Sequence, residues 1–368
     1  MAVYKRGWSA NPALIFELPR TLSHLRVAQM HVVIWNIEQP NLPYMYTPIV
    51  RTLETGFVLG NASVTTASVS IEGMMVARQL IDWLHRGDMF IWVGIGSQRL
   101  PWTILRRRGV HTVHYKTEPS SDRVECRYNA AVQENWEYTL VNTETWTRAC
   151  ANDTRAPRSR YVPPGAYADA PSRQVSRPEA EPELLFFGNV KEGGRHGARS
   201  RCFAEISTEL PGRVSWLYSA FSESAFLGRL AIANATSLCL NLHKACGRRE
   251  AALEAVRIAQ MASAGCSVLS ERAHPRDEAE YAGVVHFADN VSAAFLHWAT
   301  QTSEAQRAEG ITSALKRFRE RFSPAAIFER AGLYVRFNLT HPQPTASRPS
   351  VPSRWRCTSD NDCTGRGD

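Results

Sequence analysis

The stretch "LEAVRIAQMASAGCSVLSE", residues 253–271, has the pattern of a helix that ends at a glycine and continues into a short buried strand. Glu254 and Arg257 lie in the first turn of that helix, and Glu271 ends the strand. In parallel α/β folds, ligands bind at helix starts and at the carboxyl ends of strands. These three charged residues are therefore candidates for a ligand site.

The same alternation of apolar strand and helix continues on both sides of this stretch, which predicts parallel sheets covered by helices on both faces. A helix is expected at 70–88, where apolar residues recur at helical spacing. The predicted fold class is α/β, with two Rossmann-like domains that face each other across a cleft. Strands are expected at 31–37, 89–95, 110–116 and 138–142 in the first half, and at 184–189, 213–219, 237–243, 266–271 and 283–288 in the second.

The composition of the chain changes at 164–183, where Pro, Ala, Ser and charged residues replace the periodic pattern and indicate a linker. An N-terminal domain is predicted at 1–163, whose start lacks a clear first strand, and a second domain at 184–340. A Pro/Ser-rich linker and a short cysteine-containing stub follow at 341–368. Ligands bind in the cleft between two such domains.

The overall composition is that of a globular protein, because 44% of the 368 residues are hydrophobic and 21% are charged. The net charge of +8 comes mostly from scattered arginines, which suit a phosphate-bearing small ligand, and no nucleic acid is expected as a partner. No run of about 18 apolar residues occurs, so no transmembrane segment is expected. The start of the chain also lacks the apolar region of a signal peptide.

The cysteines indicate two environments. Six are isolated among apolar or helical residues, which predicts buried free thiols, and no CxxC pair indicates structural zinc. Cys357 and Cys363 resemble the opening of a truncated EGF-like repeat and, with five Asn-x-Ser/Thr sequons, favour the secretory pathway or Golgi over the cytoplasm. The isolated cysteines are at 126, 150, 202, 239, 246 and 266.

The chain lacks the short motifs of several enzyme classes. It has no GxGxxG, Walker loop, GxSxG or HExxH, which argues against dinucleotide dehydrogenases, P-loop NTPases, α/β-hydrolases and zinc proteases. Its one Asp-x-Asp, at 360–362, belongs to the cysteine stub. No metal and no other cofactor is therefore expected.

Four segments of the second half resemble the nucleotide-sugar-binding half of GT-B glycosyltransferases. They are "LLFFGN…ARSRC", "LNLH", the 253–271 stretch and "EYAGVVHFAD", which together cover about residues 184–335. The first half resembles the acceptor domain of such enzymes in layout, best at "DMFIWVGIGSQ" and "VHTVHYKTEP". The resemblance implies a metal-independent transfer of sugar from a nucleotide-sugar donor to the hydroxyl of an unknown acceptor, whether glycan, protein or small molecule.

The resemblance and the chemistry of a nucleotide diphosphate together suggest donor-binding roles. Carboxylates accept hydrogen bonds from ribose hydroxyls, and arginines and helix starts stabilise a diphosphate. Glu254 would bind the ribose and Arg257 a phosphate, while Gly188 would let the backbone approach the ligand. The further donor-binding candidates are Arg199, Arg201, Asn241, His243 and Glu271.

Each of these residues also has a structural interpretation. Glu254 and Arg257 are three residues apart, a spacing that suits a surface ion pair on a helix. The insert "KEGGRHG" leaves open which of the two arginines after it faces the cleft. His243 suits a strand-end histidine with satisfied hydrogen bonds, and Glu271 suits a turn cap.

On the acceptor side, an inverting reaction would need a general base. Glu118 and His114, near the end of a predicted strand, are the candidates, although Glu118 suits a turn-stabilising acid equally well. Gly94, Gly96 and Ser97 in "GIGSQ" resemble the short glycine loop that meets donor or acceptor in GT-B enzymes, or form only a turn.

The helix of the opening stretch departs from the best-known retaining GT-B subfamily, which carries two glutamates eight residues apart. Ala252 and Gln260 occupy those positions here. Retention or inversion of the sugar configuration is therefore left open. Two alternatives also remain: a catalytically inactive GT-B-like binding module of a secreted or lumenal multidomain protein, and a nucleotide-sugar epimerase.

Overall fold

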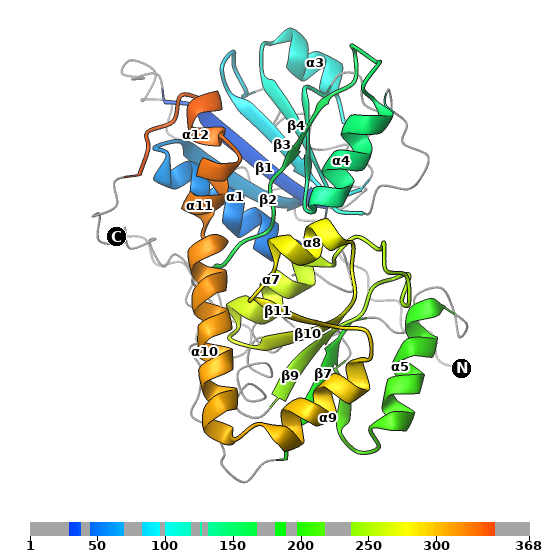
Figure 1. Cartoon of the computed structure of the whole chain (residues 1–368). Helices are drawn as coiled ribbons and strands as arrows, with labels where there is room; N and C mark the ends of the chain where they lie inside the picture. The colour runs from blue at the N-terminus through cyan, green and yellow to red at the C-terminus, as the bar shows by residue number, and fades with distance from the viewer. Residues whose placement is uncertain are drawn as a thin grey trace, which may run out of the picture.

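Two parallel β-sheets covered by α-helices form the framework of the protein (Figure 1). One sheet has six strands in the order β2-β1-β3-β4-β5-β6, and the other has five in the order β11-β10-β9-β7-β8. The predicted α/β class with two Rossmann-like sheets is confirmed. The computed structural model describes residues 29–37, 45–69, 83–95, 100–118, 126, 132–167, 181–188, 197–217 and 237–342.

The centre of the first sheet is apolar on both faces. All five residues of β3 are buried, as are six of the seven residues of β1. Trp35 packs edge-on against Phe90 with ring centroids 5.2 Å apart. The elements of this half are β1 (His31–Ile37), α1 (Thr47–Leu59), β2 (Ser63–Val69), β3 (Met89–Val93), α3 (Trp102–Arg107), β4 (His111–Lys116), β5 (Glu134–Glu137), α4 (Leu140–Ala149) and β6 (Arg158–Tyr161).

The second sheet is built in the same way, and all residues of β9 and β10 are buried. Leu184, Phe186 and Leu240 belong to the hydrophobic cluster on one of its faces. The elements are β7 (Glu183–Phe187), α5 (Ala198–Glu209), β8 (Val214–Leu217), β9 (Ser237–Asn241), α7 (Ala255–Ser263), β10 (Ser267–Glu271), α8 (Pro275–Glu280), β11 (Val285–Ala288), α9 (Val291–Gln301) and α10 (Glu304–Arg321).

The last two helices, α11 (Pro324–Arg330) and α12 (Leu333–Arg336), return to the first half of the protein beside α1 (Figure 1). Phe328 packs edge-on against Phe57 at 4.9 Å, and Arg336 Nε donates to Glu134 Oε1 at 3.0 Å. Burial opposes ionisation of Glu134, but the groups that hydrogen-bond to it, with Arg160, lower its pKa to about 2. The predicted division of the chain at 163 and 184 stays a prediction.

The two sheets share one topology, because in each the first strand lies between the second and the third. The strand order therefore reverses at β1/β3 in the first sheet and at β7/β9 in the second, and ligands bind outside the carboxyl ends of strands at such reversals. The two carboxyl edges meet: Lys244, after β9, lies 2.8 Å from the Glu118 carboxylate, after β4.

A buried carboxylate also joins the two halves. Asp277 of α8 accepts hydrogen bonds from the backbone amides of Leu140 and Val141, at the start of α4, at 3.0 and 3.3 Å. Its other oxygen accepts from the amide of Leu253 at 3.1 Å. A helix start favours a negative charge. Asp277 therefore holds the start of α4 in register with the residue that precedes Glu254.

The observed elements correct part of the sequence prediction. The strand expected at 138–142 is wrong, because β5 ends at Glu137 and the Thr139 side chain caps α4 by accepting from the Asn142 amide. The strands β2, β5 and β6 were not predicted, since none of them has a continuous apolar run. Most of the helix expected at 70–88 lies outside the described residues.

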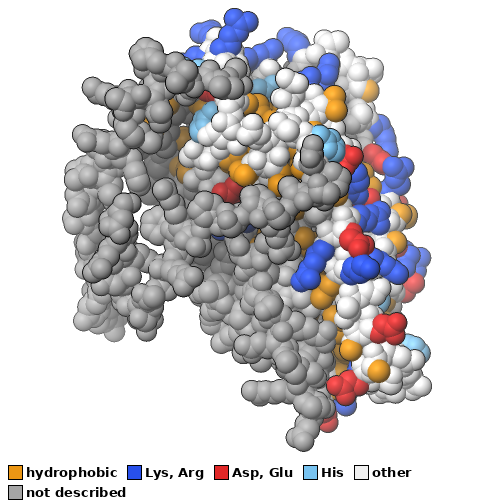
Figure 2. All heavy atoms as spheres, turned by 90° about the vertical axis from the view of Figure 1, so that its left-hand side faces the viewer, with side chains coloured by type: hydrophobic (Ala, Val, Ile, Leu, Met, Phe, Trp, Pro, Cys, Tyr) orange, Lys and Arg blue, Asp and Glu red, His pale blue; other side chains and the backbone are white. Residues whose placement is uncertain are grey.

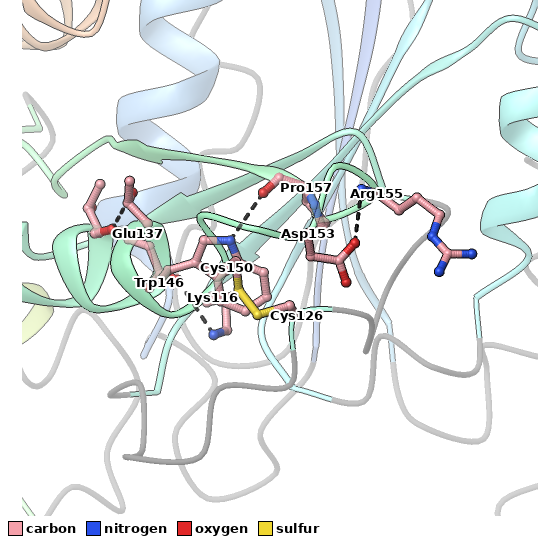
Figure 3. The surroundings of a disulfide bond; sticks show 10 residues. Lys116, Cys126, Glu137, Trp146, Cys150, Asp153, Arg155 and Pro157 are labelled. Carbon is pink, nitrogen blue, oxygen red and sulfur yellow. Dashed lines mark hydrogen bonds and ion pairs between the residues drawn. A yellow bond between two sulfur atoms is a disulfide. The ribbon is translucent and has the colours of Figure 1, made fainter.

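Disulfides replace the predicted free thiols, so that prediction is wrong. The paired segments lie 24 to 44 residues apart in sequence, and only the fold brings them together. The first disulfide ties a residue before β5 to the end of α4, beside the bond from Trp146 Nε1 to the Pro157 carbonyl (Figure 3). Disulfides persist in oxidising compartments. The pairs are Cys126–Cys150, Cys202–Cys246 and Cys239–Cys266.

Among the described residues no helix is long and apolar enough to cross a membrane, and no group of three or more His, Cys, Asp or Glu side chains could hold a metal ion. Along the right-hand edge of the face in Figure 2, basic side chains lie among acidic and hydrophobic ones. The cysteine stub at 341–368 lies almost wholly outside the described residues, so its EGF-like interpretation has no structural support.

Candidate functional site

Three charged side chains gather at the carboxyl edge of the second sheet, beside the β7/β9 reversal. We call this region the second-sheet mouth: the ends of β7, β9 and β10, the loop 242–250 and the starts of α5 and α7. At its centre Arg199 Nη2 donates to Glu254 Oε1 at 2.9 Å, and Arg257 Nη2 lies 3.9 Å from Glu254 Oε2. The exposed fractions of the three side chains are 3% for Arg199, 20% for Glu254 and 14% for Arg257.

The backbone holds Arg257 against the end of β9. Its Nη1 donates to the Leu242 carbonyl at 2.9 Å and lies 3.5 Å from the Asn241 side-chain oxygen. Its guanidinium lies over the Phe186 ring at 5.6 Å, which adds a cation–π contact. Two of the predicted donor-binding residues, Asn241 and Arg257, are therefore in contact.

Gly188 makes room for this arrangement. Its φ of +143° is a conformation that other residues rarely adopt, and a Cβ there would lie 3.3 Å from Arg257 Nη2. Its carbonyl accepts from Trp216 Nε1 at 2.9 Å. The glycine thus lets an arginine approach the backbone, and its predicted role toward a ligand stays a prediction.

Glu271 holds the loop 242–250 of the second-sheet mouth in place through its carboxylate. Its two oxygens accept from the backbone amides of His243, at 2.6 Å, and Gly247, at 2.8 Å. This is the turn-capping interpretation of Glu271. Burial raises its pKa, while the two amide hydrogen bonds act in the opposite direction.

His243 is buried, with an exposed fraction of 1%. Within the described part of the chain, neither ring nitrogen forms a hydrogen bond of normal geometry, although the Arg272 backbone lies close enough to raise its pKa. Burial outweighs the nearby Glu254 carboxylate and lowers the pKa of His243 to about 4. The imidazole is therefore neutral near pH 7, with hydrogen-bonding capacity to spare.

The electrostatics of the mouth favour an anion beside a hydroxyl-bearing group. Burial alone would raise the pKa of Glu254, but the charges of Arg257 and Arg199 outweigh it and lower the pKa. Glu254 thus stays ionised as an acceptor for hydroxyl groups, and the arginines beside it are donors suited to phosphate. Arg201, two residues beyond Arg199 on α5, is exposed, which answers the question of which arginine is buried in the cluster.

Gly94, His114 and Glu118 lie at the first-sheet mouth, which we define as the ends of β1, β3, β4 and β5. His114 is buried, and its Nε2 lies 2.9 Å from the Gly94 carbonyl; burial lowers its pKa to about 4. Gly94 has a φ of +124°, and a Cβ there would lie 2.4 Å from the Ile37 side chain. Glu118 forms the ion pair with Lys244. Gly96 and Ser97 lie outside the described residues.

Three residues of this region were missed in the sequence. Lys244 links the mouths through Glu118, and Asp277 links α4 to Leu253. Tyr138 is buried between the halves, and burial raises its pKa, with Glu254 and Glu118 adding to the effect. The "LNLHK" context was a signal for Lys244, whereas the roles of the other two depend on contacts between distant segments.

Sequence comparison gives no assignment: no protein-family model matches the chain, and no curated protein matches it either.

Solved structures show the fold. One is an alpha,alpha-trehalose-phosphate synthase (UDP-forming) from Burkholderia vietnamiensis, with TM-score 0.54 and 11% identity over 84% of this chain and 97% of that one. Sucrose-phosphate synthase from Thermosynechococcus elongatus has a TM-score of 0.52 and 14% identity, over 84% of this chain and 98% of that one. Anabaena HepE, in complex with UDP and glucose, has a TM-score of 0.51 and 10% identity, over 84% of this chain and 100% of that one. The chain therefore has the GT-B glycosyltransferase fold.

Proposed function

We propose that the protein is a metal-independent glycosyltransferase that takes a sugar from a nucleotide-sugar donor bound at the second-sheet mouth. The observation that carries the proposal is the cluster of Arg199, Glu254 and Arg257 at the strand reversal of a GT-B fold, in which Arg199 is buried and the other two are partly buried. Two guanidinium groups flank one carboxylate there, and guanidinium groups are donors suited to a diphosphate.

The proposed roles follow from the contacts. Glu254 accepts hydrogen bonds from the ribose, and Arg199 and Arg257 stabilise the diphosphate as it leaves. His243, neutral and with spare hydrogen-bonding capacity, contacts the donor beside them. Glu271 acts indirectly, because it holds the amides of His243 and Gly247. Arg201 and Asn241 make weaker candidates, since Arg201 is exposed and the Asn241 amide donates to Ser270.

The general base of an inverting reaction would come from the first-sheet mouth. Glu118 is the better candidate, because its carboxylate is half-exposed and lies at the junction of the two mouths. His114 is buried and bonded to Gly94, which leaves it in a supporting role for the glycine loop.

One observation favours a second function, a binding module that keeps the fold without catalysis. Both candidate bases have structural partners, and the glutamate pair of the best-known retaining subfamily is absent. Such a module would bind the nucleotide-sugar but transfer nothing. Disulfides persist in oxidising compartments, so the three pairs among the described residues support a location such as the secretory pathway for either protein.

A thermal-shift screen tests the proposal with UDP, GDP, ADP and their common sugar conjugates. UDP comes first, because the HepE structure holds UDP and glucose. We expect a ligand at about 100 times its Kd to stabilise the fold by about 2.7 kcal/mol, a clear rise in Tm. No shift with any nucleotide contradicts the proposal. A shift without release of nucleotide diphosphate in the presence of acceptors supports the binding module instead.

A further inference from the structure

Lys244 makes two contacts that connect the two mouths. Its backbone amide donates to Glu254 Oε1 at 3.2 Å, and its Nζ lies 2.8 Å from Glu118 Oε2. The backbone of Lys244 is thus part of the Arg199–Glu254 cluster, while its ammonium group is held by the opposite half of the protein. A single residue therefore joins the carboxylate proposed to bind the ribose to the carboxylate proposed as the base.

The ion pair of Lys244 differs from the pairs inside the cluster in its exposure. The exposed fractions are 38% for the Lys244 side chain and 43% for Glu118, against 3% for Arg199. Exposed ion pairs contribute little free energy, and a lysine carries its charge on a flexible four-carbon stem. The ammonium group can therefore change partners at small cost, whereas Arg199 cannot.

The charge of the proposed donor favours such a change. Arg199 and Arg257 are partly neutralised by Glu254 and by the carbonyls at the end of β9. A diphosphate carries more negative charge than one carboxylate and offers several acceptor oxygens. We infer that Lys244 is a positioning residue with two partners: its ammonium group pairs with Glu118 in the empty site and with the diphosphate of a bound nucleotide. This inference rests on the proposed function.

The exchange has a consequence for Glu118. When the ammonium group turns to the diphosphate, the carboxylate loses its counter-ion and becomes a better proton acceptor. Glu118 is thus released on the acceptor side once the donor is bound. The pair links occupation of one mouth to the chemical state of the other.

Two single variants with opposite expected effects test the inference, by calorimetric titration with UDP and with inorganic pyrophosphate. Lys244→Met removes the cation, and we expect it to weaken UDP binding about five- to twentyfold. Glu118→Gln removes the competitor, and we expect it to tighten binding about two- to fivefold. In the double variant the Glu118→Gln effect should vanish, because no cation is left to release. A residue with only a structural role would not give effects of opposite sign.

A second ion pair across the same two halves is the matched control. Arg276 Nη2 and Glu144 Oε1 lie 2.8 Å apart between α8 and α4, and both side chains are partly exposed. Arg276→Met and Glu144→Gln should leave UDP affinity unchanged. Weaker or unchanged binding in Glu118→Gln, or unchanged binding in Lys244→Met, overturns the inference while the proposed function stands. If the unmodified protein binds no nucleotide and no pyrophosphate, the proposed function fails, and the inference with it.

Discussion

The two mouths have the same strand topology but opposite chemistry. In the second-sheet mouth, Glu254 is flanked by two arginines that lower its pKa, and among the described residues neither ring nitrogen of His243 has a hydrogen bond of normal geometry. In the first-sheet mouth, Glu137 is fully buried with Lys116 Nζ 3.5 Å away, and His114 is bonded to the Gly94 carbonyl. Each sheet has one strand reversal, and among the described residues the paired arginines lie at the second one.

This difference explains why the strand topology alone is insufficient to locate a ligand site. Burial lowers the pKa of both histidines to about 4, so the pKa values do not distinguish them. The hydrogen bonds do, because His114 Nε2 lies 2.9 Å from the Gly94 carbonyl, whereas among the described residues no hydrogen bond of normal geometry reaches either ring nitrogen of His243. A buried polar group without a partner is costly, and a ligand is one way to offset that cost.

Removing the carboxylate of the second mouth should have the largest effect. Glu254→Ala leaves two poorly exposed arginines uncompensated, and we expect a loss of about 3–5 kcal/mol in the free energy of unfolding. UDP binding should weaken because the ribose contact is lost, whereas pyrophosphate binding should tighten because both arginines are freed. Chemical denaturation and titration calorimetry measure the two effects. Equal changes for UDP and pyrophosphate would show that Glu254 does not recognise the nucleoside.

The carboxylate of the first mouth should instead control the pH dependence of stability. Burial raises the pKa of Glu137 to about 7, against the effect of Lys116. A raised carboxyl pKa means that the folded state holds its proton more tightly than the unfolded state. The resulting stability is present below about pH 4.5 and is lost as the pH rises through 7, an effect of about 3 kcal/mol.

The variant Glu137→Gln removes this titration. Its Tm should therefore fall less than that of the unmodified protein between pH 5 and pH 8, while UDP affinity at pH 7 stays the same. The same fall in both proteins would show that Glu137 does not titrate in this range.

A disulfide beside the second-sheet mouth and a disulfide in the first half of the protein should differ in their effect on UDP binding. Cys202 lies one turn after Arg199, and Cys246 precedes Gly247, whose amide holds Glu271. Replacing both by serine should cost about 2–3 kcal/mol of stability and weaken UDP binding several-fold. The same replacement at Cys126 and Cys150 should cost similar stability and leave binding unchanged. Equal binding losses in both double variants would contradict a local role for the Cys202–Cys246 bond.

The smallest expected effects are those of replacing the two histidines, one of which should change UDP affinity and the other the Tm. His243→Asn should weaken UDP binding about fivefold, the equivalent of about 1 kcal/mol, with little change in Tm. His114→Asn should lower the Tm because it breaks the bond to Gly94, and should leave binding unchanged. Calorimetry and thermal denaturation of the pair provide the comparison. A reversed pattern would place the ligand at the first mouth.

The sequence predicted the framework well for physical reasons. The strand β1 carries a continuous apolar run from Val32 to Trp35, and the "LEAVRIAQMASAGCSVLSE" stretch contains α7, the turn at Gly265 and β10. These features are local and repeat with the period of the element. The α4 start was misread because Tyr138 and Leu140 also suit a strand, and only the cap at Thr139 and the contact with Asp277 decide for a helix.

The site was predictable only in part. Glu254, Arg257 and Glu271 could be singled out because they flank a helix start and a strand end in one short stretch. The burial of Arg199 rather than Arg201 depends on the orientation of α5, which the insert before it obscures. The disulfides and the Lys244–Glu118 pair join distant segments, and no local pattern encodes such contacts.

Titration of UDP into the unmodified protein and two arginine variants tests the central claim most directly. Arg199 is buried in the cluster and Arg201 is exposed two residues later on the same helix, so the variants differ in position but not in chemistry. We predict that Arg199→Ala weakens UDP binding at least about tenfold, that Arg199→Lys loses less, and that Arg201→Ala stays within about twofold. Equal affinity of the Arg199→Ala variant and the unmodified protein would contradict the assignment of the second-sheet mouth as the donor site.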